Sequence, residues 1–173
     1  MDQQINILFI DDDDNLYITY NKLLNANIKE NFIFDHIITA EEIEPTIMNQ
    51  KYDIIVLDQK LNNGNKGLDF LPLIKKNNIY SYVIVNSAYG NERLATEAIR
   101  HGANDYIQGN KEDNNEFLKV IQKAINSIKQ YNLMEDLAQN LYTSRQKLET
   151  KVKKQLNEIK SKIVSRSHQM EIS

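Results

Sequence analysis

The chain contains no cysteine among its 173 residues, which excludes disulfides and thiolate-bound metals. Its first four residues, Met-Asp-Gln-Gln, lack the cationic and apolar regions of a signal peptide. No uninterrupted apolar run approaches the length that crosses a membrane. These absences favour a cytoplasmic protein without a membrane partner, and the length suits one domain plus an extension.

Charge is unevenly distributed along the chain. Residues 1–128 carry 12 Lys/Arg against 19 Asp/Glu, whereas residues 129–173 carry 9 against 5. Aromatic residues are not interleaved with the lysines of the basic segment, so nucleic acid is not an expected partner. We therefore expect an acidic globular domain at 1–128, followed by a basic helical extension at 129–173.

Short apolar runs alternate with helical patterns through the first 128 residues. The runs predict strands at 5–10, 32–37, 52–57, 82–85 and 105–108, each followed by a helix. Such alternation predicts an α/β domain, in which helices cover both faces of a five-stranded parallel sheet.

The segment from Asn114 to about Ser165 has neither proline nor glycine, and it predicts one long helix. Its apolar residues recur at heptad-like spacings, with one four-residue stutter centred on Val152: Leu137, Leu141, Leu148, Val152, Leu156, Ile159 and Ile163. These seven residues, called the seam below, favour a coiled coil that makes a parallel homodimer. The alternative is a partly frayed helix without a partner.

Acidic residues follow two of the predicted strands directly. Asp11 to Asp14 come after the first strand, Asp58 ends the third, and Ser87 follows the fourth. Parallel strands end at the same edge of a sheet, so these side chains should converge there. Clustered carboxylates repel one another unless a cation joins them, and hard oxygen ligands suit Mg²⁺. A carboxylate can also attack phosphorus and form an acyl phosphate.

Two of these aspartates have a different expected role. Asp13 and Asp14 come immediately before the helical pattern that starts near residue 14. A carboxylate at a helix N-terminus accepts hydrogen bonds from unpaired backbone N–H groups and interacts favourably with the helix dipole. We therefore expect Asp13 and Asp14 to cap that helix rather than bind the metal.

Over about residues 4–128 the chain resembles the receiver domain of two-component response regulators. The resemblance rests on four segments in the family's order and spacing: Ile7–Asp12, Asp53–Asp58, Ser87-Ala88 and Ala98–Ile107. It implies a flavodoxin-like fold of the chemotaxis-regulator type, with strand order 2-1-3-4-5. It also implies a signalling phosphoprotein rather than an enzyme, one that takes a phosphoryl group from a sensor histidine kinase or a phosphotransfer protein.

The same resemblance implies the roles of the acidic residues. Asp58 is the expected phosphoacceptor, and Asp11 and Asp12 are the expected acidic pair. Mg²⁺ is expected on these three carboxylates and on the backbone carbonyl of Lys60. The loop after Asp58 lacks the family's usual proline, and its length leaves the position of Gly67 open.

The switch residues implied by the resemblance are the Ser87 hydroxyl and the Tyr106 aromatic ring. The family usually has a lysine just after the last strand, but Gly109 stands at that position here. Lys111, two positions later, or Lys60, on the other side of the site, is the expected substitute for that cation.

Two other interpretations use the same residues. A pseudo-receiver, meaning a scaffold that works without phosphorylation, would account for the missing lysine. Asp11 and Asp13 also satisfy the Asp-x-Asp pattern of haloacid dehalogenase-type phosphohydrolases. That family needs a positioned lysine and a late acidic pair, which the sequence does not offer, and Asp58 would have no role in it.

Overall fold

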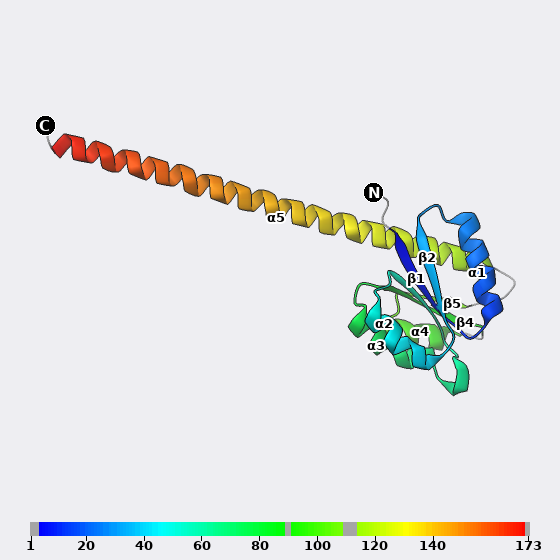
Figure 1. The fold of residues 1–173 in the computed structure, drawn as a ribbon. Helices are drawn as coiled ribbons and strands as arrows, with labels where there is room; N and C mark the ends of the chain where they lie inside the picture. Colours follow the sequence, from blue (N-terminus) through cyan, green and yellow to red (C-terminus); the bar gives the residue numbers. More distant parts are fainter. Residues whose placement is uncertain (1–3, 89–90, 109–113, 172–173) are drawn as a thin grey trace. The chain divides into compact units, whose positions relative to one another are not determined.

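The computed structural model describes residues 4–88, 91–108 and 114–171, with side chains up to Ser167. The chain divides into two compact units, Met1–Ile128 and Lys129–Ser173. Figure 1 traces the elements of each unit in sequence order. Within the described ranges, no helix combines the length and the apolar character needed to cross a membrane.

The first unit is built on a parallel sheet with the strand order β2-β1-β3-β4-β5. Its strands are β1 (Ile5–Ile10), β2 (Phe32–Ile37), β3 (Ile54–Asp58), β4 (Tyr82–Ser87) and β5 (Asp105–Gln108). The predicted doubly wound fold and its strand order are confirmed. The chain reverses its direction of travel across the sheet between β1 and β3, so a crevice opens beyond the carboxyl ends of these two strands.

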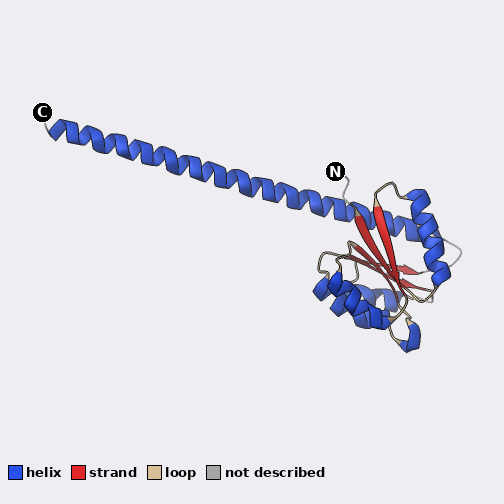
Figure 2. Ribbon diagram, viewed as in Figure 1, coloured by secondary structure: helices blue, strands red, loops and turns tan. Residues whose placement is uncertain are grey.

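Helices cover both faces of this sheet (Figure 2). They are α1 (Asp14–Asn27), α2 (Ile43–Asn49), α3 (Leu71–Asn77), α4 (Glu92–Arg100) and the part of α5 (Asn114–Glu171) that belongs to the first unit. Successive strand residues point to opposite faces. Phe9 therefore packs with Tyr20 of α1 and Phe117 of α5, whereas Leu8 packs in a second core layer with residues of α2, α3 and α4. The sheet is thus buried on both sides.

Strand β3 begins two residues later than the predicted run at 52–57 and includes Asp58. The two residues before it, Tyr52 and Asp53, form side-chain hydrogen bonds. The Asp53 carboxylate accepts a hydrogen bond from the Asn6 N–H at 2.8 Å, and the Tyr52 hydroxyl donates to Asp35 at 3.0 Å. These bonds fix the approach of β3 to the sheet before its own ladder begins.

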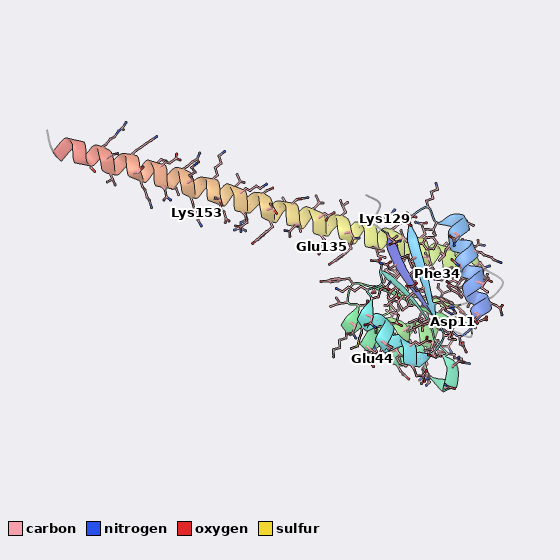
Figure 3. The ribbon with its side chains drawn as sticks, viewed as in Figure 1. Asp11, Phe34, Glu44, Lys129, Glu135 and Lys153 are labelled. Atoms are coloured by element: carbon pink, nitrogen blue, oxygen red, sulfur yellow. The ribbon has the colours of Figure 1, made fainter. Side chains whose placement is uncertain are left out.

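The second unit consists of the later part of α5, and the predicted long C-terminal helix is confirmed. Its seam residues are between 49 and 71% exposed, so the apolar stripe is not buried. One i,i+4 ion pair lies on its surface, with Arg145 Nε 2.9 Å from Glu149 Oε1. Figure 3 draws the side chains along this helix and labels Glu135 and Lys153.

Candidate functional site

Three carboxylates converge beyond the carboxyl ends of β1 and β3. Ile10 pairs with Leu57 in the ladder between these strands, so the next residues, Asp11 and Asp58, lie beside each other. Carboxylate oxygens of Asp11, Asp12 and Asp58 all lie within 4.8 Å of one another. Figure 3 labels Asp11 at this edge of the sheet. The strand ends thus bring together the three acidic residues named from the sequence.

The protonation of this cluster reflects its burial. The pKa of Asp58 is raised to about 7, chiefly by burial and also by the negative charge of Asp11, while hydrogen bonding to the backbone at Gln59 and Lys60 lowers it. Burial likewise raises the pKa of Asp11 to about 6, against a 2.9 Å hydrogen bond from the Asp13 N–H. The site therefore retains protons near neutral pH when no cation is bound.

The carboxylates line a cavity of about 290 Å³. Its other walls come from the start of α1, the loop after β3 and the end of β4: Asp13, Leu16, Tyr20, Lys60, Leu61, Asn86, Ser87 and Ala88. Two of the expected residues, Ser87 and Lys60, are therefore at the site. Asp13 also caps α1, because its carboxylate accepts from the N–H groups of Asn15 and Leu16 at 3.0 and 3.2 Å.

The remaining expected residues lie outside this cavity lining. Tyr106 pairs with Val85 in the β4–β5 ladder and packs against the core layer of α2, α3 and α4. Its hydroxyl is buried and has no hydrogen-bond partner among the described residues. Gly109 and Lys111 lie outside the described part of the chain, so the structure does not locate the candidate Lys111.

Two residues of the site were not anticipated from the sequence. Asn86 is only 4% exposed and lines the cavity beside Ser87. Tyr20 of α1 stacks on Phe117 of α5, with ring centroids 3.6 Å apart. The pKa of Tyr20 is raised to about 12, chiefly by burial and also by the charge of Asp11, while a hydrogen bond with Asn86 lowers it. The sequence signal for Asn86 is weak, because it is a polar residue directly after the apolar run at 82–85 and before Ser87.

The loop after β3 packs directly against the backbone of Asp58. Gly67 donates its N–H to the Gln59 carbonyl at 2.9 Å. A Cβ atom at position 67 would lie 2.0 Å from the Asp58 carbonyl oxygen, which is far inside the van der Waals limit. Only glycine therefore fits there, and this contact gives Gly67 the location that the loop length left open.

A family model for the response regulator receiver domain matches residues 7–122. The chain belongs to this family. An NtrX-like response regulator of Rickettsia felis is 30% identical over 122 residues, covering 69% of this chain and 24% of the relative. The regulatory protein RegA of Rhodobacter capsulatus is 28% identical over 100 residues, covering 58% of this chain and 53% of RegA. The chain thus spans about a quarter to a half of the length of these relatives.

Solved receiver domains have the same fold. A signal receiver domain from Vibrio parahaemolyticus matches with a TM-score of 0.65 and 25% identity, over 77% of this chain and 98% of that one. A beryllofluoride-activated NtrC4 receiver domain dimer matches with a TM-score of 0.61 and 27% identity, over 71% and 98%. Receiver domains bind Mg²⁺ at an acidic pocket, and the cluster of Asp11, Asp12 and Asp58 forms such a pocket here.

Proposed function

We propose that this receiver domain accepts a phosphoryl group on Asp58 from a histidine kinase or a phosphotransfer protein, with Mg²⁺ bound beside it. The observation that carries this proposal is the position of Asp58 in the cluster. Its carboxylate ends β3, faces a cavity and lies within 4.8 Å of Asp11 and Asp12. A carboxylate at the end of a strand, beside two others and open to a cavity, suits a nucleophile next to a metal site.

The donor set fits Mg²⁺. Three clustered carboxylates offer hard oxygen ligands, and the raised pKa values of Asp58 and Asp11 reflect burial and repulsion that a divalent cation would offset. The backbone carbonyl of Lys60, in the segment that lines the same cavity, is proposed as the further protein ligand. When bound, Mg²⁺ supplies positive charge that stabilises the developing charge on phosphoryl oxygens.

Asp58 is the proposed nucleophile. One of its carboxylate oxygens attacks phosphorus, and the bond from phosphorus to the donor's histidine nitrogen breaks, with the electron pair leaving on that nitrogen. The ionised carboxylate is the reactive form, and backbone hydrogen bonds from Gln59 and Lys60 favour it.

Ser87 and Tyr106 are the proposed switch. Ser87 is 3% exposed and lines the same cavity as Asp58. Its hydroxyl is the proposed donor to a phosphoryl oxygen on Asp58. Tyr106 pairs with Val85, two residues before Ser87 on the same face of β4, and its hydroxyl is buried without a partner among the described residues. Movement of Ser87 would therefore change the surroundings of Tyr106. Lys60 or Lys111 is the proposed cation for the phosphoryl group in place of the family's lysine.

The second part of the proposal is a homodimer through the seam of α5. Seven apolar residues at heptad-like spacing remain about half exposed or more in the single chain, and a parallel coiled coil would bury them. The dimeric NtrC4 receiver domain is a precedent for self-association in the family. Phosphorylation of Asp58 would act on the output by changing how two such chains pair.

Acetyl phosphate with Mg²⁺ tests the chemistry on the full chain. Intact mass should show one phosphoryl adduct on the wild-type protein, and peptide mapping should locate it on Asp58. Asp58→Asn should abolish the adduct, because it removes the nucleophile and keeps the side-chain shape. Asp69→Asn is the matched control, since Asp69 is an exposed aspartate outside the cavity lining, and it should leave the adduct unchanged.

Two results would contradict the proposal. A wild-type chain without any adduct would favour the phosphorylation-independent pseudo-receiver. Continued phosphate release from acetyl phosphate by Asp58→Asn would favour a phosphohydrolase whose nucleophile is another aspartate. Removal of Mg²⁺ with EDTA should prevent adduct formation in the wild-type protein, because Asp58 and Asp11 then favour their protonated forms and no cation stabilises the charge on the phosphoryl oxygens.

A further inference from the structure

Asn86 is a buried polar residue with an unusual environment. Its side chain is 4% exposed, and its Oδ1 has no hydrogen-bond partner among the described residues. Leaving a buried amide oxygen unpaired is unfavourable, and an apolar residue such as valine would fill a strand position without this penalty. An orphaned polar atom of this kind, in a residue that lines a cavity, points to a ligand that completes its hydrogen bonding.

The sheet register aligns Asn86 with the acidic cluster. Asp58 and Asn86 are direct partners in the ladder between β3 and β4. The backbone N–H of Gln59 donates to the backbone carbonyl of Asn86 at 2.9 Å. Side chains of paired residues in parallel strands lie on the same face, with about 4.8 Å between the strands. Asp11, Asp58 and Asn86 therefore form a row across β1, β3 and β4, and all three line the cavity.

Tyr20 holds the other end of the Asn86 amide. The two side chains interact, because hydrogen bonding to Asn86 lowers the pKa of the Tyr20 hydroxyl. The Tyr20 ring itself is fixed, because it stacks on Phe117 at an interplanar angle of 4° and packs edge-on against Phe9. The carboxamide is thus supported from the core side, and Asn86 also lines the cavity.

We propose that the Asn86 carboxamide binds the phosphoryl group, donating a hydrogen bond from Nδ2 to a phosphoryl oxygen on Asp58, with Tyr20 as its positioning residue. This inference rests on the proposed function, because it requires Asp58 to be the phosphoacceptor. The neighbours of Asn86 in the row are carboxylates, which accept hydrogen bonds when ionised, and phosphoryl oxygens accept them as well. The group of Asn86 that complements them is therefore its N–H donor, Nδ2. A 180° turn of the amide exchanges Nδ2 and Oδ1 without changing its shape, and Oδ1 then accepts the Tyr20 hydroxyl proton.

Beryllofluoride with Mg²⁺, which mimics a phosphoryl group without needing a chemical step, tests this on the full chain. Its affinity is read from amide chemical shifts. Asn86→Val should weaken beryllofluoride binding about ten-fold, because a hydrogen bond to a charged acceptor is lost. The same variant should unfold at an equal or higher urea concentration than the wild type, because it removes an unpaired buried polar atom. A purely structural asparagine would show the opposite pattern, lower stability with unchanged affinity.

Three variants sharpen the test. Asn86→Asp has the same shape but replaces the donor with an acceptor, so it should weaken beryllofluoride binding more than Asn86→Val does. Tyr20→Phe keeps the stacked ring and removes the hydroxyl, and a smaller loss of a few-fold is expected. Asn25→Ala changes an exposed asparagine of α1 and should bind as tightly as the wild type.

The possible results separate this inference from the proposed function. Wild-type binding together with undiminished binding by Asn86→Val overturns the inference and leaves Asp58 as the phosphoacceptor. Tighter Mg²⁺ binding by Asn86→Asp with undiminished beryllofluoride affinity also overturns it, because Asn86 would then be a cation ligand. A wild-type chain that neither binds beryllofluoride nor takes a phosphoryl group on Asp58 overturns both proposals. If Asn86→Val does not fold, Asn86→Asp decides.

Discussion

At the scale of single residues, ionisation of the acidic cluster is unfavourable in the metal-free receiver domain. The pKa of Asp58 is raised to about 7 and that of Asp11 to about 6, chiefly by burial, from an ordinary value of 3.8. Between about pH 4 and pH 7 the folded chain therefore binds more protons than the unfolded chain. Its free energy of unfolding must fall as the pH rises through this window.

We predict that Asp58→Asn removes much of this pH dependence. Without Mg²⁺, the stability difference between Asp58→Asn and the wild type should grow in favour of the variant from pH 4 to pH 7.5. Allowing for solvent screening, it should reach on the order of 1–3 kcal/mol. Urea unfolding in EDTA at a series of pH values measures it. Asp69→Asn should follow the wild-type curve, and a constant difference for Asp58→Asn across the window would contradict the burial argument.

The site residues differ in how far the sequence could predict them. Asp11, Asp12 and Asp58 were predictable, because each comes at or directly after the end of an apolar run and parallel strands share one edge. Asn86 was not predictable, because a polar residue that follows an apolar run usually marks only the end of the strand. Tyr20 occupies an apolar position of the α1 pattern, and only the packing on Phe117 reveals that its hydroxyl points towards the site.

At the scale of elements, the start of α1 is tied to the site through one side chain. The Asp13 carboxylate accepts hydrogen bonds from Asn15 and Leu16, as expected for a cap, and the Asp13 N–H donates to Asp11. The fold class was predictable because the alternation of strands and helices follows from hydrophobic periodicity. The start of β3 was not predictable, because it depends on the contact between Asp53 and Asn6, which lie far apart in the sequence.

We predict that Asp13→Ala lowers the free energy of unfolding by about 1 kcal/mol, because two backbone N–H groups of α1 lose their acceptor. Asp13→Asn should retain most of the stability, since asparagine is also a good cap. Chemical denaturation of the two variants and the wild type provides the measurement. Equal destabilisation by alanine and asparagine would show that the charge of Asp13 matters more than its capping hydrogen bonds.

At the scale of the whole molecule, the exposed seam determines the expected oligomeric state. We predict that the full chain is a dimer at tens of micromolar and that Leu148→Lys with Leu156→Lys converts it to a monomer, because two charged residues would enter the apolar interface. Multi-angle light scattering gives the mass directly. The basic charge of the 129–173 segment should make the wild-type dimer stronger as salt increases.

The matched control for this prediction places the same charges elsewhere on the helix. Gln146→Lys with Ser161→Lys adds two lysines at exposed positions, each two residues from a seam residue and thus on another side of α5. This variant should remain dimeric. A monomeric wild-type chain, or equal dissociation of both double variants, would rule out the seam as the interface.

The contact between Gly67 and the Asp58 carbonyl has a consequence for how this protein tolerates sequence variation. The segment around Gly67 belongs to a surface loop, and loops usually accept substitutions. Position 67 is an exception, because any added carbon atom would push on the peptide group that carries the proposed nucleophile. In a library of random variants, position 67 should therefore be as intolerant as the acidic residues themselves, although its side chain is a single hydrogen atom.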